Sequence, residues 1–143
     1  MINFLKLHKD AKIPVRGSAE AAGLDLFIIE SVTIPPGHRA LLGTGLAMSL
    51  PFGQGGFIEP RSKLASNCGI TVLARVIDSD YRGEIMVNLL NTGLDPVELR
   101  AGDKAAQMVI QAHLSWQDIV EVDELDTTDR ASEGINSAEQ RLR

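Results

Sequence analysis

The side chains best suited to chemistry lie in one short stretch, VIDSDYRGE, which runs from Val76 to Glu84. It contains three carboxylates, an arginine and the only tyrosine of the chain. Apolar, β-branched runs precede and follow it, over 70–77 and 85–90, so we expect a β-hairpin whose bend carries these groups. Because a hairpin bend requires only a glycine and one or two turn formers, the surplus of polar groups makes this bend a candidate site.

Two interpretations of the bend stay open on local grounds. The first is a solvated acidic turn, in which Asp78 and Asp80 accept backbone N–H groups. The second is a binding or catalytic site. A calcium loop of the EF-hand type is excluded, because its twelfth position would be Leu89, which cannot supply the bidentate carboxylate.

A second candidate site lies where we expect the one short helix. Ser62 is a suitable N-cap residue, 63–67 would form about one and a half turns, and Gly69 can end the helix. Arg61 would then stand at the helix N-terminus. Unpaired N–H groups, a hydroxyl and a guanidinium together make an anion site of the kind that phosphates use. The alternative is a plain loop cap with a surface arginine.

Two further polar residues stand in apolar surroundings. Asp25 follows Leu24 in AAGLDL, at the start of an expected strand, where it is either an ordinary polar residue of a half-buried strand or the acid of a site. Gln107 lies in a strand that is otherwise apolar through Ile110. A buried glutamine must find hydrogen-bond partners, so Gln107 either organises a polar network or points outward.

The elements that must position these residues are short strands. Three of them stand out by alternation or β-branching, and they are expected over Leu24–Ile29, Arg39–Leu50 and Lys104–Ala112. Turn signals recur about every 8–15 residues and no long helical period is present, which favours an all-β sandwich, jelly roll or barrel. After Glu121 the apolar content collapses, so we expect a core over 1–122 and a C-terminal arm over 123–143 that would be disordered alone.

The composition favours one globular domain. The chain has 143 residues, of which 44% are hydrophobic and 23% charged, and it lacks both a signal peptide pattern and an apolar run of membrane-spanning length. The single cysteine, Cys68, excludes an intramolecular disulfide and fits a reducing compartment, so a cytoplasmic location is expected. The net charge of −5 argues against general nucleic-acid binding.

The order of the motifs is more specific than any one of them. AAGLDL, PRSKLA, VIDSDYRGE and GDKAAQ, followed by an arginine-containing tail, resemble the homotrimeric dUTP pyrophosphatase (dUTPase) family from about Gly17 to Ser137. The resemblance implies a distorted jelly roll, or β-clip barrel, with one short helix and a flexible C-terminal arm. It also implies homotrimers with shared active sites that hydrolyse dUTP to dUMP and pyrophosphate, which keeps uracil out of DNA and supplies dUMP for dTMP synthesis.

The resemblance assigns the hairpin to the base, the sugar and the reaction. Asp78 resembles the residue that orients and deprotonates the water attacking the α-phosphorus, and Tyr81 resembles the ring that packs under the deoxyribose. Family members read uracil with the main chain of this hairpin. The further residues expected to contact substrate here are Arg75, Val76, Ile77, Gly83 and Glu84.

The resemblance assigns the remaining motifs to the phosphates. Arg61 and Ser62, with Lys63 beside them, resemble the phosphate-binding residues at the helix start, and Gln107 resembles a glutamine near the α-phosphate. Asp25 resembles an acid that contacts Mg²⁺ through its hydration shell. This ion is the implied cofactor, and it would let an acidic protein bind a highly charged anion.

Three departures from the family pattern concern the arm, the hairpin and the helix start, where Lys63 replaces a small residue in a way that is benign or helpful to phosphate binding. The arm keeps Arg130, which resembles the arginine that closes over the γ-phosphate, but it has Ile135 in place of an aromatic that stacks over uracil. Several glycines of the usual arm are also replaced, and Glu133 adds negative charge. Arg75 stands where the family commonly has glycine, so its side chain would either crowd the base or offer a new contact.

Two rival functions remain open. A dCTP deaminase shares the jelly roll, although the Asp78 hairpin fits hydrolysis better. The other rival is a dUTPase-fold regulator that binds nucleotide or a protein partner with weak turnover, and only the altered arm and Arg75 favour it.

Overall fold

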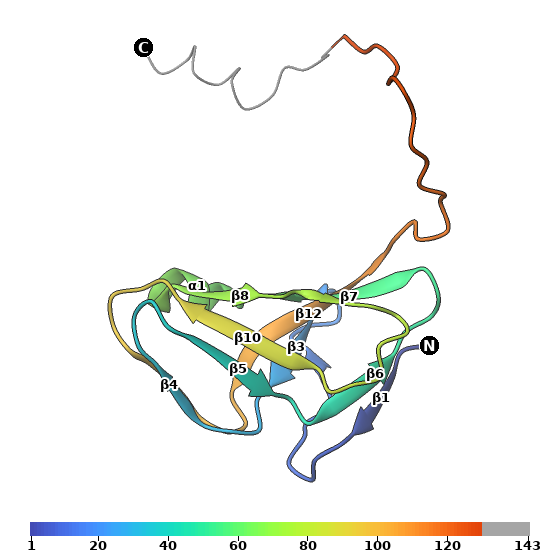
Figure 1. Cartoon of the computed structure of the whole chain (residues 1–143). Coiled ribbons are helices and arrows are strands. Elements are labelled where there is room, and N and C mark those ends of the chain that lie inside the picture. Colours follow the sequence, from blue (N-terminus) through green and yellow to red (C-terminus); the bar gives the residue numbers. More distant parts are fainter. Residues whose placement is uncertain (130–143) are drawn as a thin grey trace, which may run out of the picture.

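The computed structural model describes residues 1–129, which form a mostly β fold with one short helix (Figure 1). The strands are, in chain order, β1 (Asn3–Lys6), β2 (Val15–Arg16), β3 (Gly23–Phe27), β4 (Val32–Ile34), β5 (Arg39–Gly43), β6 (Leu46–Ser49), β7 (Gln54–Glu59), β8 (Ile70–Leu73), β9 (Val76–Ile77), β10 (Met86–Asn91), β11 (Val97–Leu99) and β12 (Lys104–Ala112). The helix α1 (Ser62–Cys68) lies between β7 and β8. The all-β prediction is confirmed.

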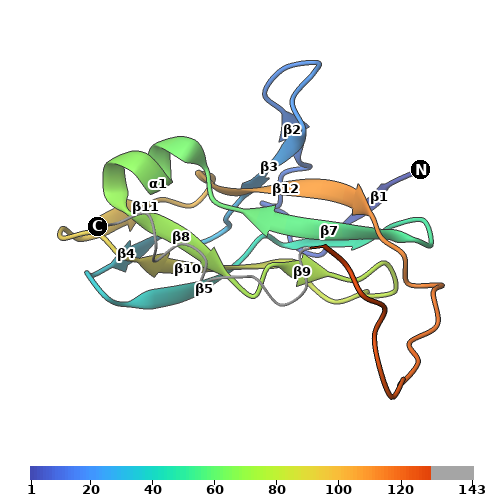
Figure 2. The same cartoon turned by 90° about the horizontal axis from the view of Figure 1, so that it is seen from above.

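The largest sheet is built around β12, whose bounds match the predicted strand Lys104–Ala112. Its five strands run in the order β2-β3-β12-β7-β9, and every neighbouring pair is antiparallel. A second sheet has the order β5-β10-β8, and the pairs β1-β6 and β11-β4 complete the described fold (Figure 2). The sheets do not close into a single barrel.

The core lies between the two larger sheets. Leu26, Ile58 and Met108 from the five-stranded sheet are fully buried, and they join one hydrophobic cluster with Val87 and Leu89 from β10. Full burial of such a side chain stabilises the folded state by about 1.5–3 kcal/mol. The paired sheets therefore form a rigid frame from which the polar residues of β3, β7 and β12 project.

The predicted single strand Arg39–Leu50 is two strands. β5 pairs with β10, while β6 pairs with β1, and the chain changes sheets between them. The change occurs at Gly45, whose φ of 67° is in the left-handed region that favours glycine. A Cβ at this position would lie 2.8 Å from the Cβ of His8, so the close approach of the two segments also requires glycine.

The predicted helix is confirmed, but its N-cap is Arg61 rather than Ser62. Arg61 has an extended backbone (φ −84°, ψ 135°) and its carbonyl oxygen accepts the amide of Ala65 at 2.9 Å, whereas Ser62 is already helical and no side chain caps the amides. Because the cap residue is defined by this change of backbone conformation, the hydroxyl of Ser62 sits one position too late to act as the cap. Gly69 ends the helix with φ 70°, as predicted.

The predicted hairpin is only half correct. β8 and β10 do pair, with Leu73 opposite Asn88, but the chain leaves this ladder at Ala74. Ala74 has φ 52°, and it is the one non-glycine residue of 1–129 with a positive φ. The chain then crosses to the other sheet, where β9 pairs with the edge of β7 and leads into Asp78. The bend therefore belongs to a connection that leaves the sheet of β8, pairs with the other sheet through β9 and returns to the first sheet at β10.

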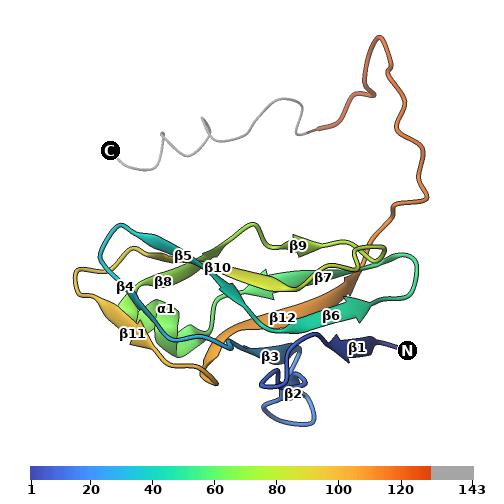
Figure 3. The same cartoon turned by 60° about the horizontal axis from the view of Figure 1, so that its bottom comes forward.

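The segment after β12 leads away from the sheets (Figures 1 and 3). Every residue over 114–129 is exposed, and no strand or helix is present there. Trp116 packs near Phe52 with ring centroids 6.4 Å apart. Within residues 1–129, no helix has the length and apolar content needed to cross a membrane.

Candidate functional site

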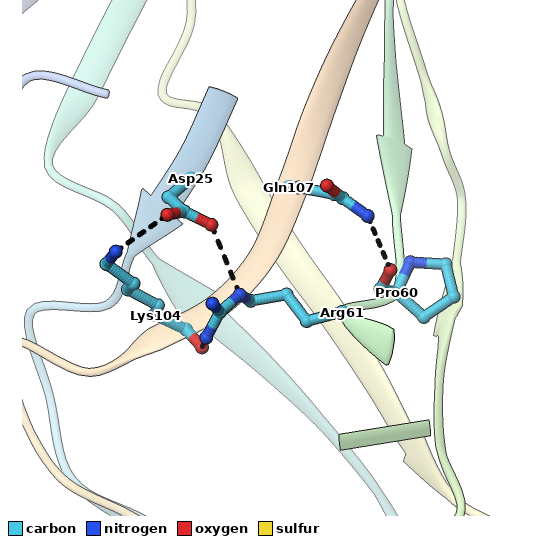
Figure 4. Close-up of polar contacts among 5 residues, drawn as sticks. All are labelled: Asp25, Pro60, Arg61, Lys104 and Gln107. Atoms are coloured by element: carbon cyan, nitrogen blue, oxygen red, sulfur yellow. Dashed lines mark hydrogen bonds and ion pairs between the residues drawn. The ribbon is translucent and has the colours of Figure 1, made fainter. Parts of the chain in front are cut away.

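The carboxylate of Asp25 is held between two cations (Figure 4). Its Oδ1 lies 3.1 Å from Nε of Arg61 and its Oδ2 lies 2.7 Å from Nζ of Lys104, and the residue is buried. Nη1 of Arg61 also donates to the carbonyl oxygen of Lys104 at 3.3 Å. A buried carboxylate is stable only when it is paired, so this arrangement answers the open question about Asp25: it is the centre of a polar cluster.

Gln107 fixes the chain just before Arg61. It lies directly opposite Asp25 on β3 and Glu59 on β7, so the three side chains project from one face of the sheet. Its Nε2 donates to the carbonyl oxygen of Pro60 at 3.0 Å (Figure 4). Gln107 therefore organises a polar network, which was one of the two expectations from the sequence.

Gly23 makes room for the amide of Gln107. A Cβ at Gly23 would lie 2.2 Å from Oε1 of Gln107, which is far inside van der Waals contact. A side chain at the glycine of the AAGLDL motif would therefore displace the glutamine amide, which crosses over this backbone.

A cavity of about 250 Å³ opens beside these residues. Its lining includes Asp25, Gln107 and the predicted phosphate-binding residues Arg61, Ser62 and Lys63. Two cationic side chains, Arg61 and Lys63, line it with a single carboxylate, Asp25, which is also paired with Lys104 outside the lining, so positive charge is in excess. A polar cavity of this charge suits an anion such as a phosphate.

Asp78 stands apart from this cluster, exposed in the turn after β9. Neither its carboxylate nor that of Asp80 makes a hydrogen bond or ion pair with any part of the described chain. Two other bonds close the turn. The amide of Tyr81 donates to the carbonyl oxygen of Asp78 at 3.2 Å, and Arg82 donates to the carbonyl oxygen of Ser79 at 2.7 Å. The turn therefore does not use these carboxylates as the acidic-turn interpretation requires. Asp78 is left with free acceptor atoms.

The rest of the turn is compact. Oη of Tyr81 donates to the carbonyl oxygen of Glu84 at 3.1 Å, and a Cβ at Gly83 would lie only 2.3 Å from that hydroxyl oxygen. Oε1 of Glu84 accepts the amide of Gly45 at 2.7 Å, which anchors the end of the turn to the loop between β5 and β6. Val76 is exposed and Ile77 is buried on the edge of the five-stranded sheet.

The structure brings the predicted site residues together in two separate groups. Asp25, Arg61, Ser62, Lys63 and Gln107 share one cavity. No residue of 76–84 lines that cavity, and within the described chain none makes a hydrogen bond or ion pair with the residues that do. Arg75 lies against Glu59 instead of projecting from the turn. Arg130 and Ile135 lie outside the described residues.

Sequence reasoning missed Lys104 and Glu59. Lys104 is three positions before Gln107, which by strand alternation places the two side chains on opposite faces. A register shift between Lys104 and Ala106 breaks that alternation and turns Lys104 toward Asp25. Glu59 could have been found only from the register of β7 against β12, which the sequence does not give.

Comparison with known proteins identifies relatives over nearly the whole chain. A family model described as dUTPase matches residues 9–139. The deoxyuridine 5′-triphosphate nucleotidohydrolase of Wolinella succinogenes is 49% identical over 138 residues, covering 95% of this chain and 92% of that protein. The Mus musculus protein of the same name is 42% identical over 136 residues, covering 95% of this chain and 83% of that one.

Solved structures show the same fold. The dUTPase of Staphylococcus bacteriophage 80alpha, determined with dUpNHpp, has a TM-score of 0.89 at 24% identity and covers 96% of this chain and 97% of that chain. A mutant dUTPase from phage phi11 of S. aureus, described as coordinating a structural Mg(II) ion, has a TM-score of 0.82 at 24% identity and covers 89% and 99%.

Proposed function

This chain belongs to the dUTPase family, and we propose that it hydrolyses dUTP to dUMP and pyrophosphate in homotrimers with shared sites. This reaction keeps uracil out of DNA and supplies dUMP for dTMP synthesis. The single observation that carries the proposal for this chain is the contrast between its two candidate carboxylates. Asp25 has a cation on each oxygen, whereas Asp78 is exposed and free.

Asp78 is the general base of the proposed reaction. Its carboxylate accepts a proton from a water molecule, the water oxygen bonds to the α-phosphorus, and pyrophosphate leaves as that bond forms. A positioned carboxylate of this kind contributes about 10²–10⁴ in rate. Asp25 is unsuited to the role, because protonating it would break its pairing with Arg61 and Lys104.

The cavity of the Asp25 cluster binds the phosphates. Arg61, Ser62 and Lys63 supply the guanidinium, hydroxyl and ammonium donors that line it. Gln107 donates one Nε2 hydrogen to the carbonyl oxygen of Pro60. Because an amide nitrogen carries two hydrogens, the second is available to an α-phosphate oxygen. Asp25 holds Arg61 in place and contacts substrate through no atom of its own.

Mg²⁺ fits this donor set as an ion held through water. Among residues 1–129, no group of three or more His, Cys, Asp or Glu is placed to hold a metal directly. Mg²⁺ commonly keeps several waters and binds substrate phosphates, and each oxygen of Asp25 has acceptor capacity beyond its ion pair, so this carboxylate can accept a hydrogen bond from such a water. When bound, the ion neutralises triphosphate charge.

The turn after β9 recognises the nucleoside. We assign the uracil edge to the main chain of Val76, Ile77, Gly83 and Glu84, and the deoxyribose to the ring of Tyr81. The hydrogen bond from Tyr81 to Glu84 and the close fit over Gly83 support a fixed ring. A site of fixed donors and acceptors can reject a base with the wrong edge by about 10⁴–10⁵.

Sharing of the site between subunits would bring together the phosphate cavity and the Asp78 turn, which lie apart within one chain. A second copy would bring its Asp78 turn to this cavity, and the arm over 123–143 would supply Arg130 and Ile135 as a lid. We also propose a cytoplasmic location, in keeping with the free thiol of Cys68.

The test is pyrophosphate release from dUTP, dCTP, dTTP and UTP in parallel with Mg²⁺. We expect turnover of dUTP alone. Ammonia release from dCTP would instead show a deaminase, and tight dUTP binding without pyrophosphate release would show a nucleotide-binding regulator.

Replacing Gly23 tests the fixed position of Gln107. In Gly23→Ala the new Cβ takes the place of Oε1, so the glutamine amide must turn away and the carbonyl oxygen of Pro60 loses its donor. We expect kcat/KM for dUTP to fall about tenfold, which corresponds to the loss of about one hydrogen bond. Steady-state kinetics measure this change.

Gly17→Ala is the matched control for that substitution. Gly17 borders the same cavity, but a Cβ there meets no atom within 4 Å, so its kcat/KM should stay near that of the natural chain. Equal losses in both variants would show that the cavity backbone, and not the placement of Gln107, is responsible.

A further inference from the structure

The side chain of Arg75 is bound to the end of β7. Its Nε donates to the carbonyl oxygen of Ile58 at 3.1 Å, and its Nη2 pairs with the carboxylate of Glu59. The main chain is joined at the same place, since the amide of Ile58 donates to the carbonyl oxygen of Arg75 at 2.8 Å. The guanidinium is therefore committed to protein groups, although half of the side chain is exposed.

These contacts lengthen a very short ladder. β9 pairs with β7 through Gly56–Ile77 and Phe57–Val76 only, and the next pair in the register would be Ile58 and Arg75. At a hydrogen-bonded pair of a regular antiparallel ladder the two residues exchange both backbone bonds. Here only the bond from Ile58 to Arg75 forms, because the backbone turns away at Ala74, in the left-handed region. The Nε of Arg75 takes the carbonyl oxygen of Ile58 that a backbone amide would otherwise use.

The contacts of Arg75 with Ile58 and Glu59, which we call the Arg75 clamp, act on the segment that carries the proposed base. Asp78 follows β9 directly, so the position of its carboxylate depends on how firmly a two-residue edge strand is held. Glu59 is fixed in turn by its place opposite Gln107 in the centre of the sheet. Figure 2 shows β9 beside β7, to which it is held by two ladder pairs and the Arg75 contacts, while the side chain of Ile77 is buried in the core.

We propose that Arg75 is a positioning residue, which acts through Glu59 and Ile58 to fix β9 and thereby the Asp78 carboxylate, and which does not itself contact the base. This inference rests on the proposed function only for its catalytic consequence; the restraint on β9 is a property of the free protein. It accounts for an arginine at a position where a glycine would leave β9 without these contacts.

Five variants separate positioning from direct contact. Arg75→Gln and Glu59→Gln each break the ion pair, and their double variant removes it from both sides. Arg75→Lys keeps the charge but loses the forked donor, and the exchanged pair Arg75→Glu with Glu59→Arg restores an ion pair in reverse. Arg100→Gln is the control, because the exposed side chain of Arg100 makes no bond to the described chain.

The first readout is amide hydrogen exchange over 76–80 without nucleotide, which does not depend on activity. We expect exchange to quicken about three- to tenfold in Arg75→Gln and Glu59→Gln, a modest change because the pair is part-exposed. The double variant should be no faster than Arg75→Gln, and Arg75→Lys should be intermediate. The exchanged pair should recover only in part, because a glutamate at position 75 cannot donate to the carbonyl oxygen of Ile58. Unchanged exchange in Arg75→Gln would overturn the proposal.

The second readout is the division between kcat and KM for dUTP. Positioning predicts a three- to tenfold fall in kcat in both single variants, and the double variant should fall no further than Arg75→Gln. A direct contact of Arg75 with the base predicts a raised KM in Arg75→Gln alone, with Glu59→Gln unaffected, and this result would overturn the proposal. If the natural chain does not hydrolyse dUTP, the proposed function is wrong. The exchange measurement still tests whether the Arg75 clamp restrains β9.

Discussion

Asp78→Asn is expected to lower kcat for dUTP by about 10²–10⁴ while leaving the fold and nucleotide binding intact. An amide in this position keeps the size of the side chain but cannot accept the proton of the attacking water. The exposed carboxylate of Asp78 makes no bond to the described chain, so no folded-state interaction is lost with it. Pre-steady-state and steady-state pyrophosphate release measure the rate, and the midpoint of thermal unfolding should not move.

Asp80→Asn is the matched control, because the chain offers a second free carboxylate two positions away in the same turn. It carries the same change in charge, and its kcat should stay near that of the natural chain. A comparable fall in both variants would mean that the turn acts through its overall negative charge, and Asp78 would lose its assignment as the base.

Arg61→Gln is expected to cause the second large loss, lowering kcat/KM by roughly 10²–10³. The substitution removes a cation from the phosphate cavity and also leaves Asp25 with Lys104 as its sole ionic partner. Lys104→Gln separates the two effects. It deprives Asp25 of the other cation, yet Lys104 does not line the cavity, so stability should fall in both variants while dUTP binding falls far more in Arg61→Gln.

Calorimetric titration with a non-hydrolysable dUTP analogue gives the affinity, and thermal unfolding gives the stability. Equal affinities in Arg61→Gln and Lys104→Gln would show that Arg61 serves the fold and not the phosphates.

Mixing the two inactive variants tests whether sites are shared. Each chain keeps its phosphate cavity apart from its Asp78 turn, so a trimer formed from Asp78→Asn and Arg61→Gln subunits should contain some sites with both groups intact. We expect activity above that of either parent after the mixture is unfolded and refolded together. No gain over the parents would place each complete site within one subunit.

The regular parts of the fold follow from the sequence because they obey local rules. β12 has the bounds that alternation predicts, and α1 ends at Gly69 as its glycine indicates. The predicted strand and hairpin fail where the chain changes sheets. Gly45 splits one expected strand in two, and Ala74 takes the chain out of a ladder that the apolar runs alone would continue.

The candidate site shows the same division between local and distant causes. The types and order of Asp25, Arg61 and Gln107 mark them in the sequence, but Asp25 could not be told from an ordinary strand residue without its partners. Lys104 was missed because a register shift reverses its face. Glu59 was missed because its place depends on the register of β7 against β12, which the sequence does not give.

The register shift at the start of β12 also governs how this protein can be recombined with its relatives. Lys104 reaches Asp25 only because one extra residue separates it from Ala106 in the ladder. A chimera whose crossover falls within 104–106 and drops that residue would keep a continuous strand, yet it would turn the lysine to the opposite face. Asp25 would then keep one cation instead of two. Residues 104–106 are therefore inherited as one unit, and viable crossovers should fall on either side of them.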